Sequence, residues 1–227
     1  MIRVSAGWNE KQKKLKGYLS ASETFEKGKK LLLEMHGLLH ERKVYNNGDT
    51  FYDDLWNDLT EGACRIISKK ETSILWNIWH ITRIEDIVAN ILIKNKDAVF
   101  NEDIQKKLNI KIKDTGNAMT RKEMELFNRE VKIKELKNYR TKTGKSTRKI
   151  IEGLKFEDMK RKVEKQSLQN IRNAGGVTND EKSIWLLDFW GRKNILGLIM
   201  MPITRHQIVH LNDCFNIKEK EKRHAVP

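Results

Sequence analysis

The chain has 227 residues, a formal net charge of +14, 38% hydrophobic residues and 33% charged residues. That is enough apolar material for a core under a highly charged surface, and the length favours one domain with elaborations over two domains. No run of about 18 apolar residues occurs, and the first residues lack the apolar core of a secretory signal, so we expect neither a membrane span nor a signal peptide. The two cysteines, Cys64 and Cys214, form no CxxC motif, so we expect a soluble, cytoplasmic protein with both thiols reduced.

The positive charge has two interpretations. A basic balance is typical of nucleic-acid binding, but here the lysines are spread over the stretches "KQKKLKG", "KGKK", "KNYRTKTGKSTRK" and "EKEKR", and most lie beside acidic residues. A solvated surface explains this pattern as well. We therefore expect no specific nucleic-acid partner and at most weak, salt-sensitive binding.

Helical patterns follow one another in the first half of the chain. Residues 1–20 form an N-terminal extension, and residues 22–43 carry apolar positions near helical spacing, with Ser20 and Glu23 at capping-box spacing. Thr50 is placed to cap a short helix, "FYDDLWNDL". From Ser73 to about residue 94 a broad apolar stripe predicts a long helix capped by Ser73.

The second half continues in the same way. Thr120 and Glu123 form a capping box before "MTRKEMELFNREV" continues as a helix, and residues 134–154 and 155–173 predict two more. The loop 174–181 precedes a helix at "SIWLLDFWGRK". Pro202 fits the first turn of a last helix, "PITRHQIVHLNDCFNIKEKEK".

These patterns predict an all-α protein, because no valine-rich alternation competes with them. Short pieces such as "NIKIK" (109–113) are the exceptions that could be strands. About four long helices with shorter connecting ones bury their stripes most simply as a bundle, formed by a single domain over residues 1–227.

Histidines are the residues most indicative of chemistry. Two pairs have HxxxH spacing, "HGLLH" (36–40) and "HQIVH" (206–210), and residues four apart on a helix lie on one face, where two imidazoles can share a metal ion. His80, in the most apolar helix, is the natural third ligand. Three histidines with open coordination positions are typical of a catalytic metal site. The alternative is that His80 is an ordinary core residue whose ring nitrogens are hydrogen-bonded within the protein.

The motifs resemble those of the DinB/YfiT-like superfamily. "SILWNIWHITRIED" (73–86) and, far downstream, "MPITRHQIVHLNDC" (201–214) carry the resemblance, supported in order by "LLEMHGLLH", "TFYDDLW", "MTRKEMELF" and "WLLDFWG". Asn212-Asp213 stands where the resemblance leads us to expect asparagine followed by glutamate.

The resemblance implies a four-helix bundle with a crossover between its second and third helices, often a homodimer. It also implies a divalent ion, zinc or nickel, on His80, His206 and His210. Better understood relatives use the metal with low-molecular-weight thiols such as mycothiol or bacillithiol, and others are expected to be hydrolases. A metal-dependent thiol transferase or hydrolase acting on a small molecule is the implied function. The alternative is a non-catalytic bundle that serves as a binding or stress-response module.

Four further residues have open roles. His36 and His40 either line the pocket or contribute a ligand. Asp213 lies on the same helix face as His210 and either orients an imidazole or is solvated. Arg83, one turn from His80, either binds an anionic substrate group or pairs with a nearby acid. Trp76 and Trp79 are interpreted as core residues rather than as a substrate platform.

Overall fold

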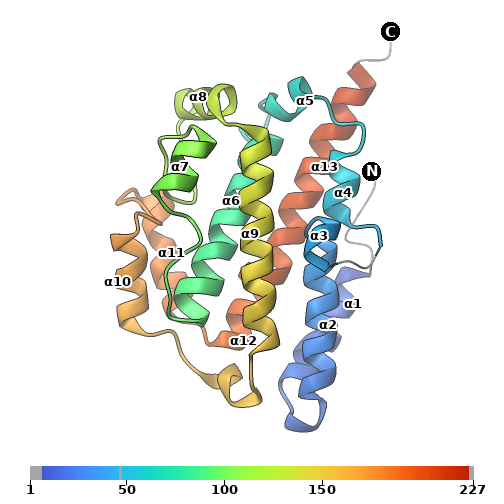
Figure 1. The fold of residues 1–227 in the computed structure, drawn as a ribbon, viewed down its shortest axis with the longest axis vertical. Coiled ribbons are helices and arrows are strands. Elements are labelled where there is room, and N and C mark those ends of the chain that lie inside the picture. Colours follow the sequence, from blue (N-terminus) through green and yellow to red (C-terminus); the bar gives the residue numbers. More distant parts are fainter. Residues whose placement is uncertain (1–6, 46–47, 225–227) are drawn as a thin grey trace.

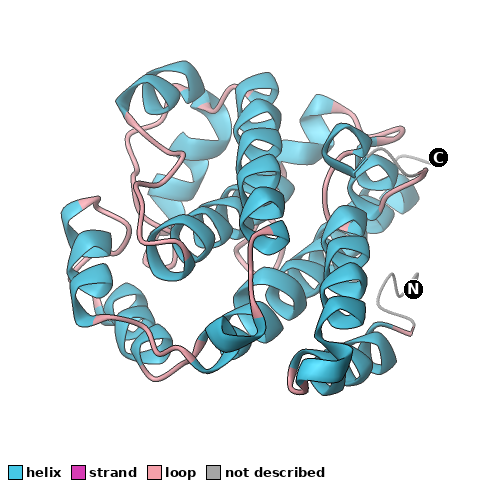
Figure 2. Cartoon of the chain, turned by 60° about the horizontal axis from the view of Figure 1, so that its bottom comes forward, coloured by secondary structure: helices cyan, strands magenta, loops and turns pink. Residues whose placement is uncertain are grey.

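The computed structural model describes residues 7–45 and 48–224, and within these ranges the chain forms helices and loops with no strand beyond one isolated bridge, between Lys162 and Asn194. Figure 2 shows the helices and their connecting loops. The predicted all-α fold is confirmed. The stretch 109–113 contains no strand, and Asn109, in the left-handed conformation, ends the helix before it.

The helical elements are, in chain order, α1 (Trp8–Leu19), η1 (Ser22–Thr24), α2 (Phe25–Leu38), α3 (Arg42–Tyr45), α4 (Phe51–Trp56), α5 (Glu61–Arg65), α6 (Ile74–Asp86), η2 (Ile87–Ile93), α7 (Glu102–Leu108), α8 (Arg121–Glu130), α9 (Ile133–Glu152), η3 (Phe156–Lys160), α10 (Lys165–Asn173), α11 (Glu181–Gly191), α12 (Ile195–Leu198), η4 (Ile199–Arg205) and α13 (His206–His224). Here η1 and η3 are 3₁₀ turns, whereas η2 and η4 are π-helical.

Helices α2, α6, α9 and α13 form the main body of the arrangement (Figure 1). Helix α6 packs against both α9 and α13, and α9 packs against α2. The short helices α7 and α8 lie in the crossover that joins α6 to α9, while α1 packs along α2. Every residue of α6 is buried, so this helix forms the centre of the core.

Most of the expected helix starts are present. Ser73, Thr50 and Thr120 each accept a hydrogen bond from a backbone N–H in the first turn of their helix, and Thr120 with Glu123 completes the capping box. The expected box at Ser20 and Glu23 is wrong. Ser20 instead ends α1, and its hydroxyl donates to the carbonyl of Lys16.

The last helix begins earlier than expected. Pro202 does not open it but lies inside the π-helical η4, which joins α12 to α13 without a break. Proline lacks the backbone N–H of a regular helical turn, and its ring clashes with the carbonyl four residues earlier. The wider π-helical turn accommodates the proline inside a continuous helix. Two buried side chains donate to backbone carbonyls of this turn: Thr204 Oγ1 to that of Ile199 and Gln207 Nε2 to that of Pro202. The turn immediately precedes His206.

Two other segments differ in detail. Residues 155–173 were expected to form one helix but divide into η3 and α10. The N-terminal extension carries α1, whose Trp8, Leu15 and Leu19 are buried in the core.

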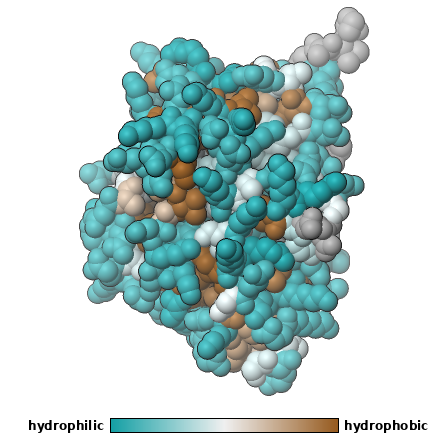
Figure 3. Space-filling view, viewed as in Figure 1, coloured by the Kyte–Doolittle hydropathy of each residue, from teal (hydrophilic) through white to brown (hydrophobic). Residues whose placement is uncertain are grey.

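The surface is largely hydrophilic on the face drawn in Figure 3, with small hydrophobic patches between polar side chains. Cys64 and Cys214 are both buried as free thiols. In the described part of the chain, no helix combines the length and apolar character that crossing a bilayer requires.

Candidate metal centre

Three histidines from two helices converge, with His80 buried and His206 and His210 half-buried. His80 comes from α6, and His206 and His210 occupy the first two turns of α13. Their candidate ligand nitrogens lie within 4.8 Å of one another, and the Nε2 atoms of His80 and His206 are 3.2 Å apart. The neighbouring elements α6 and α13 therefore bring together residues that are far apart in sequence, as predicted from the HxxxH spacing and the resemblance.

Hydrogen bonds fix the tautomers of two of these imidazoles. His80 Nδ1–H donates to the carbonyl oxygen of Thr115 at 2.8 Å. His210 Nδ1–H donates to Oδ1 of Asn77 at 2.6 Å, and the Asn77 amide is oriented in turn because its Nδ2 donates to the Ser73 carbonyl. Both rings therefore carry a lone pair and no proton on Nε2, as a metal ligand requires. The Nδ1 atom of His206 is buried without a partner among the described residues.

Burial keeps the three rings neutral at neutral pH. It lowers the pKa of His80 to about 3, with a smaller effect of His210. Burial also lowers the pKa of His210 to about 4, followed by the charge of Lys70, and it holds the pKa of His206 well below its usual value. A divalent ion therefore meets little competition from protons at this site.

The distances fit a single ion. Two nitrogens bound to one zinc ion at about 2.0–2.1 Å with a near-tetrahedral angle lie about 3.3 Å apart. The 3.2 Å separation of the His80 and His206 Nε2 atoms is close to that value. Without an ion or a proton between them, two such lone pairs repel each other. The donor set thus fits a divalent ion with open coordination positions.

A loop fixes the position of α6, the helix that carries His80. Four consecutive backbone carbonyls, those of residues 113–116, accept hydrogen bonds from one face of α6: Arg83 Nε donates to Lys113, Trp79 Nε1 to Asp114, His80 Nδ1 to Thr115 and Trp76 Nε1 to Gly116. We call residues 113–117 the carbonyl loop. Its donors are spaced i, i+3, i+4 and i+7, which places them on one helix face. The tryptophans of this motif therefore position the loop as well as filling the core.

Gly116 makes the close approach possible. Its φ is +78°, and a Cβ at this position would lie 2.9 Å from Trp76 Nε1. Trp76 also stacks on the His80 ring at a centroid distance of 4.6 Å and an interplanar angle of 11°.

An open apolar pocket of about 150 Å³ lies against the histidines. His80 and His206 form part of its wall, and α11 supplies Trp185, Phe189 and Trp190. Larger pockets exist elsewhere, including one of about 340 Å³ beside Lys70 and Asp213, but none of the three histidines lines that one. The smaller pocket gives a ligand access to His80 and His206.

A family model described as the DinB superfamily matches residues 52–183, more than half of the chain. This chain belongs to the DinB superfamily. The match includes His80 and the carbonyl loop but ends before His206 and His210, so the ligand pair on α13 rests on the geometry described above. No curated protein and no solved structure gives a significant match.

Within this DinB-superfamily bundle, two residues with open roles pair with groups other than the three histidines. Arg83 is fully buried; besides its bond to Lys113, its guanidinium lies 3.6 Å from the Asp86 carboxylate and over the Phe100 ring. Asp213 pairs with Lys70 at 3.1 Å, and the group that orients His210 is Asn77.

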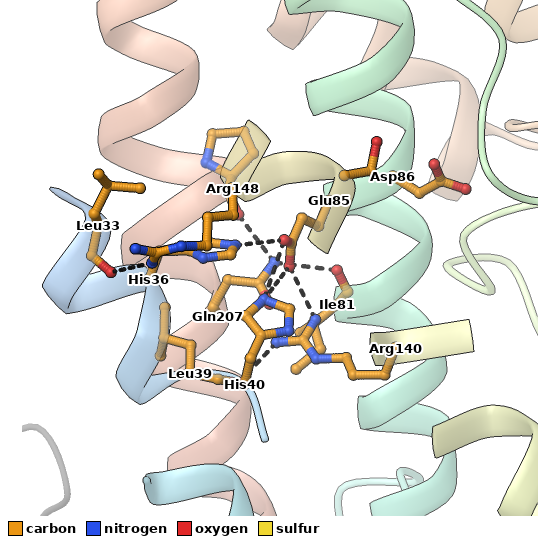
Figure 4. Close-up of polar contacts among 12 residues, drawn as sticks. Leu33, His36, Leu39, His40, Ile81, Glu85, Asp86, Arg140, Arg148 and Gln207 are labelled. Atoms are coloured by element: carbon orange, nitrogen blue, oxygen red, sulfur yellow. Dashed lines mark hydrogen bonds and ion pairs between the residues drawn. The ribbon is translucent and has the colours of Figure 1, made fainter. Parts of the chain in front are cut away.

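The second HxxxH pair belongs to a separate buried cluster (Figure 4). His36 and His40, from α2 and its C-terminal end, both hydrogen-bond through Nε2 to the Glu85 carboxylate, at 2.9 Å and 3.0–3.1 Å. Arg140 from α9 donates to Glu85 Oε2 and to the Leu39 carbonyl, each at 3.0 Å. None of the four side chains is exposed, so the cluster joins α2, α6 and α9 in the core.

The charges in this cluster balance without an ion. Burial opposes ionisation of Glu85, but the charge of Arg140 and the hydrogen bonds from His40 and His36 outweigh it and hold the Glu85 pKa well below its usual value. Burial, and then the Arg140 charge, lower the pKa of His40 to about 3. His36, His40 and Glu85 do offer ligand atoms within 4.8 Å of one another. Arg140 already neutralises the carboxylate, however, and would repel a second cation.

Sequence reasoning did not find several of the residues that shape these sites. Asn77 lies one turn before His80 on α6, a spacing that could have indicated it. Thr115 acts through its backbone carbonyl, which no side-chain pattern predicts. Arg140 lies in a lysine-rich helix and has no distinguishing sequence signal.

Proposed function

We propose that this protein is a metal-dependent enzyme in which His80, His206 and His210 hold one divalent ion, zinc or nickel. The observation that carries the proposal is the convergence of their imidazoles, with the Nε2 atoms of His80 and His210 unprotonated. When bound, the ion supplies Lewis acidity, which lowers the pKa of a bound water or thiol. Three protein ligands leave positions open for that group.

The remaining chemistry belongs to the protein. Thr115 and Asn77 keep His80 and His210 in the ligating tautomer. The apolar wall from α11 excludes water from one side of the cluster and receives a small molecule. Transfer to or from a low-molecular-weight thiol and hydrolysis are the two reaction classes that such a site serves. We expect the substrate to be a small molecule in either case.

Metal analysis of protein purified without a histidine tag tests the proposal. We expect about one equivalent of ion in the wild type and little in His206→Ala or His210→Ala. His224→Ala is the matched control, because it removes an imidazole from the far end of the same helix. His36→Ala and His40→Ala should also keep the ion, since their imidazoles contact Glu85.

Thermal unfolding provides an independent measurement. An ion that binds only the folded state stabilises it by about 2.7 kcal/mol at a hundredfold excess over its dissociation constant. A chelator should therefore lower the melting temperature of the wild type and scarcely change that of His206→Ala. Wild-type protein with no bound ion and no chelator response would remove the main support for an enzyme. Loss of the ion in His40→Ala but not in His80→Ala would show that the ligand assignment is wrong.

A further inference from the structure

The pocket beside the histidines has the size and lining of a site for one apolar group. Its volume is about 150 Å³, and its apolar wall includes Trp185, Phe189, Trp190 and Met201. An engineered cavity of about this volume with an apolar lining binds benzene. Trp185 is 48% exposed and packs edge-on against Phe189, so the aromatic wall reaches the molecular surface. A group of benzene size can enter from that side.

Asn117 is the amide side chain among the residues that line this pocket. The carbonyl loop fixes its position: residues 113–116 are held against α6 by four hydrogen bonds, and Gly116 N–H donates to Asp114 Oδ1. The Thr115 hydroxyl donates to Asn117 Oδ1 at 2.6 Å. The Asn117 amide therefore has its oxygen engaged, while its NH₂ group donates to no partner among the described residues and is available to a ligand.

The chemistry of this amide limits what can bind. A side-chain NH₂ group only donates, so the ligand must present an acceptor. No lysine or arginine lines the pocket, which favours a neutral acceptor such as a carbonyl oxygen over a carboxylate. Ligand pockets commonly combine an apolar lining with a few polar groups that fix orientation.

We propose that the pocket binds small carbonyl compounds, with an apolar group of about benzene size against Trp185 and Phe189 and the carbonyl oxygen accepting a hydrogen bond from Asn117 Nδ2. This names the substrate class of the proposed enzyme, and in that sense it rests on the proposed function. The binding itself depends on the pocket and on Asn117, so it can be measured without metal.

The test compares two probes of nearly the same shape, acetophenone and isopropylbenzene, of which only the first has an acceptor oxygen. Each is titrated into full-length protein in the presence of a chelator, and the tryptophan indole N–H signals are followed by NMR. We expect both probes to bind the wild type and to shift the same indole signals. Phe189→Ala should weaken both several-fold, because it removes part of the shared apolar wall.

Asn117→Leu should weaken acetophenone about fivefold, the effect of one neutral hydrogen bond, and leave isopropylbenzene within twofold. Asn117→Asp keeps an acceptor for the Thr115 hydroxyl but removes the donor, so it should weaken acetophenone at least as much. Asn138→Leu, at an exposed asparagine on α9, is the matched control and should change neither probe.

The proposal is overturned if neither probe binds the wild type saturably, or if both Asn117 variants bind acetophenone as tightly as the wild type. It is also overturned if they weaken the two probes equally, which would indicate a general loss of the pocket. Metal content is measured on the same preparations before chelator is added. A preparation without metal in which the Asn117 variants weaken acetophenone alone would refute the proposed enzyme and retain this site. A preparation that carries metal and binds neither probe saturably would do the reverse.

Discussion

Replacement of Arg140 by methionine should be among the most destabilising single changes in this protein. Arg140 is fully buried and supplies the cation next to the Glu85 carboxylate, at 3.0 Å. Methionine keeps most of the apolar stem but leaves the carboxylate buried with only the imidazoles of His36 and His40 as donors. The Leu39 carbonyl also loses the donor that Arg140 provides.

The expected loss is about 3–5 kcal/mol, the usual cost of removing one partner of a buried ion pair. Small domains have a total unfolding free energy of about 5–15 kcal/mol, so this is a large fraction. The double variant Arg140→Met/Glu85→Met removes both charges and should regain part of the loss. Full recovery is not expected, because two buried imidazole N–H groups then lack an acceptor at about 1–3 kcal/mol each.

The loss of unfolding free energy in Arg140→Met should also depend on pH. In the wild type, burial and then the Arg140 charge lower the pKa of His40 to about 3. Without Arg140, the Glu85 carboxylate favours protonation of His40. If the folded pKa of His40 rises above its unfolded value of about 6.5, protonation adds stability below that pH, and the gain is lost as pH rises. The deficit relative to wild type is therefore expected to be smaller at pH 5.5 than at pH 8.

Urea unfolding followed by circular dichroism at both pH values, with chelator present throughout, measures these differences. Equal destabilisation of the single and double variants would refute the view that the uncompensated carboxylate is the cause. A deficit below about 1 kcal/mol at pH 8 would mean that water reaches Glu85 in the folded protein and solvates it.

Two further predictions concern the histidine cluster. In chelator, the unfolding free energy of the wild type should fall as pH drops below about 6.5. The folded-state pKa values of His40 and His80 are lowered to about 3 and that of His210 to about 4, so the unfolded chain binds protons first. Each of these rings contributes a slope of about 1.4 kcal/mol per pH unit, and equal urea midpoints at pH 7 and pH 5 would contradict this. Asn77→Leu removes the acceptor that fixes the His210 tautomer, so it should lower metal affinity about 10–100-fold in a competition titration. An unchanged affinity would show that Asn77 does not orient His210.

Local patterns predicted the parts of the fold that depend on local interactions. Ser73 and Thr120 cap their helices because a side-chain oxygen there reaches the backbone N–H groups of the first turn. Ser20 shows the limit of this reasoning. It has the spacing of a cap, but the chain before it folds into α1, and Ser20 ends that helix.

The candidate site also contains residues that local patterns predict and residues that they do not. HxxxH spacing places His206 and His210 on one face, and resemblance adds His80. The partners of these rings lie outside such patterns: a backbone carbonyl at Thr115 looks the same in every sequence, and Arg140 reaches Glu85 only through the packing of α9 on α6. The π-helical turn at Pro202 is likewise not evident from the sequence, because proline is normally expected in the first turn of a helix; here Gln207 donates to the Pro202 carbonyl within the turn.

The carbonyl loop has a consequence for how the protein can evolve. The acceptors for Trp76, Trp79, His80 and Arg83 are main-chain oxygens, and no substitution of a loop side chain removes them while the backbone keeps its path. The aromatic wall of the pocket, in contrast, consists of ordinary side chains on α11, in a different part of the chain. Mutations can therefore reshape the pocket while the orientation of His80 is inherited unchanged. Such a division lets the shape of the pocket change while the backbone that orients His80 stays the same.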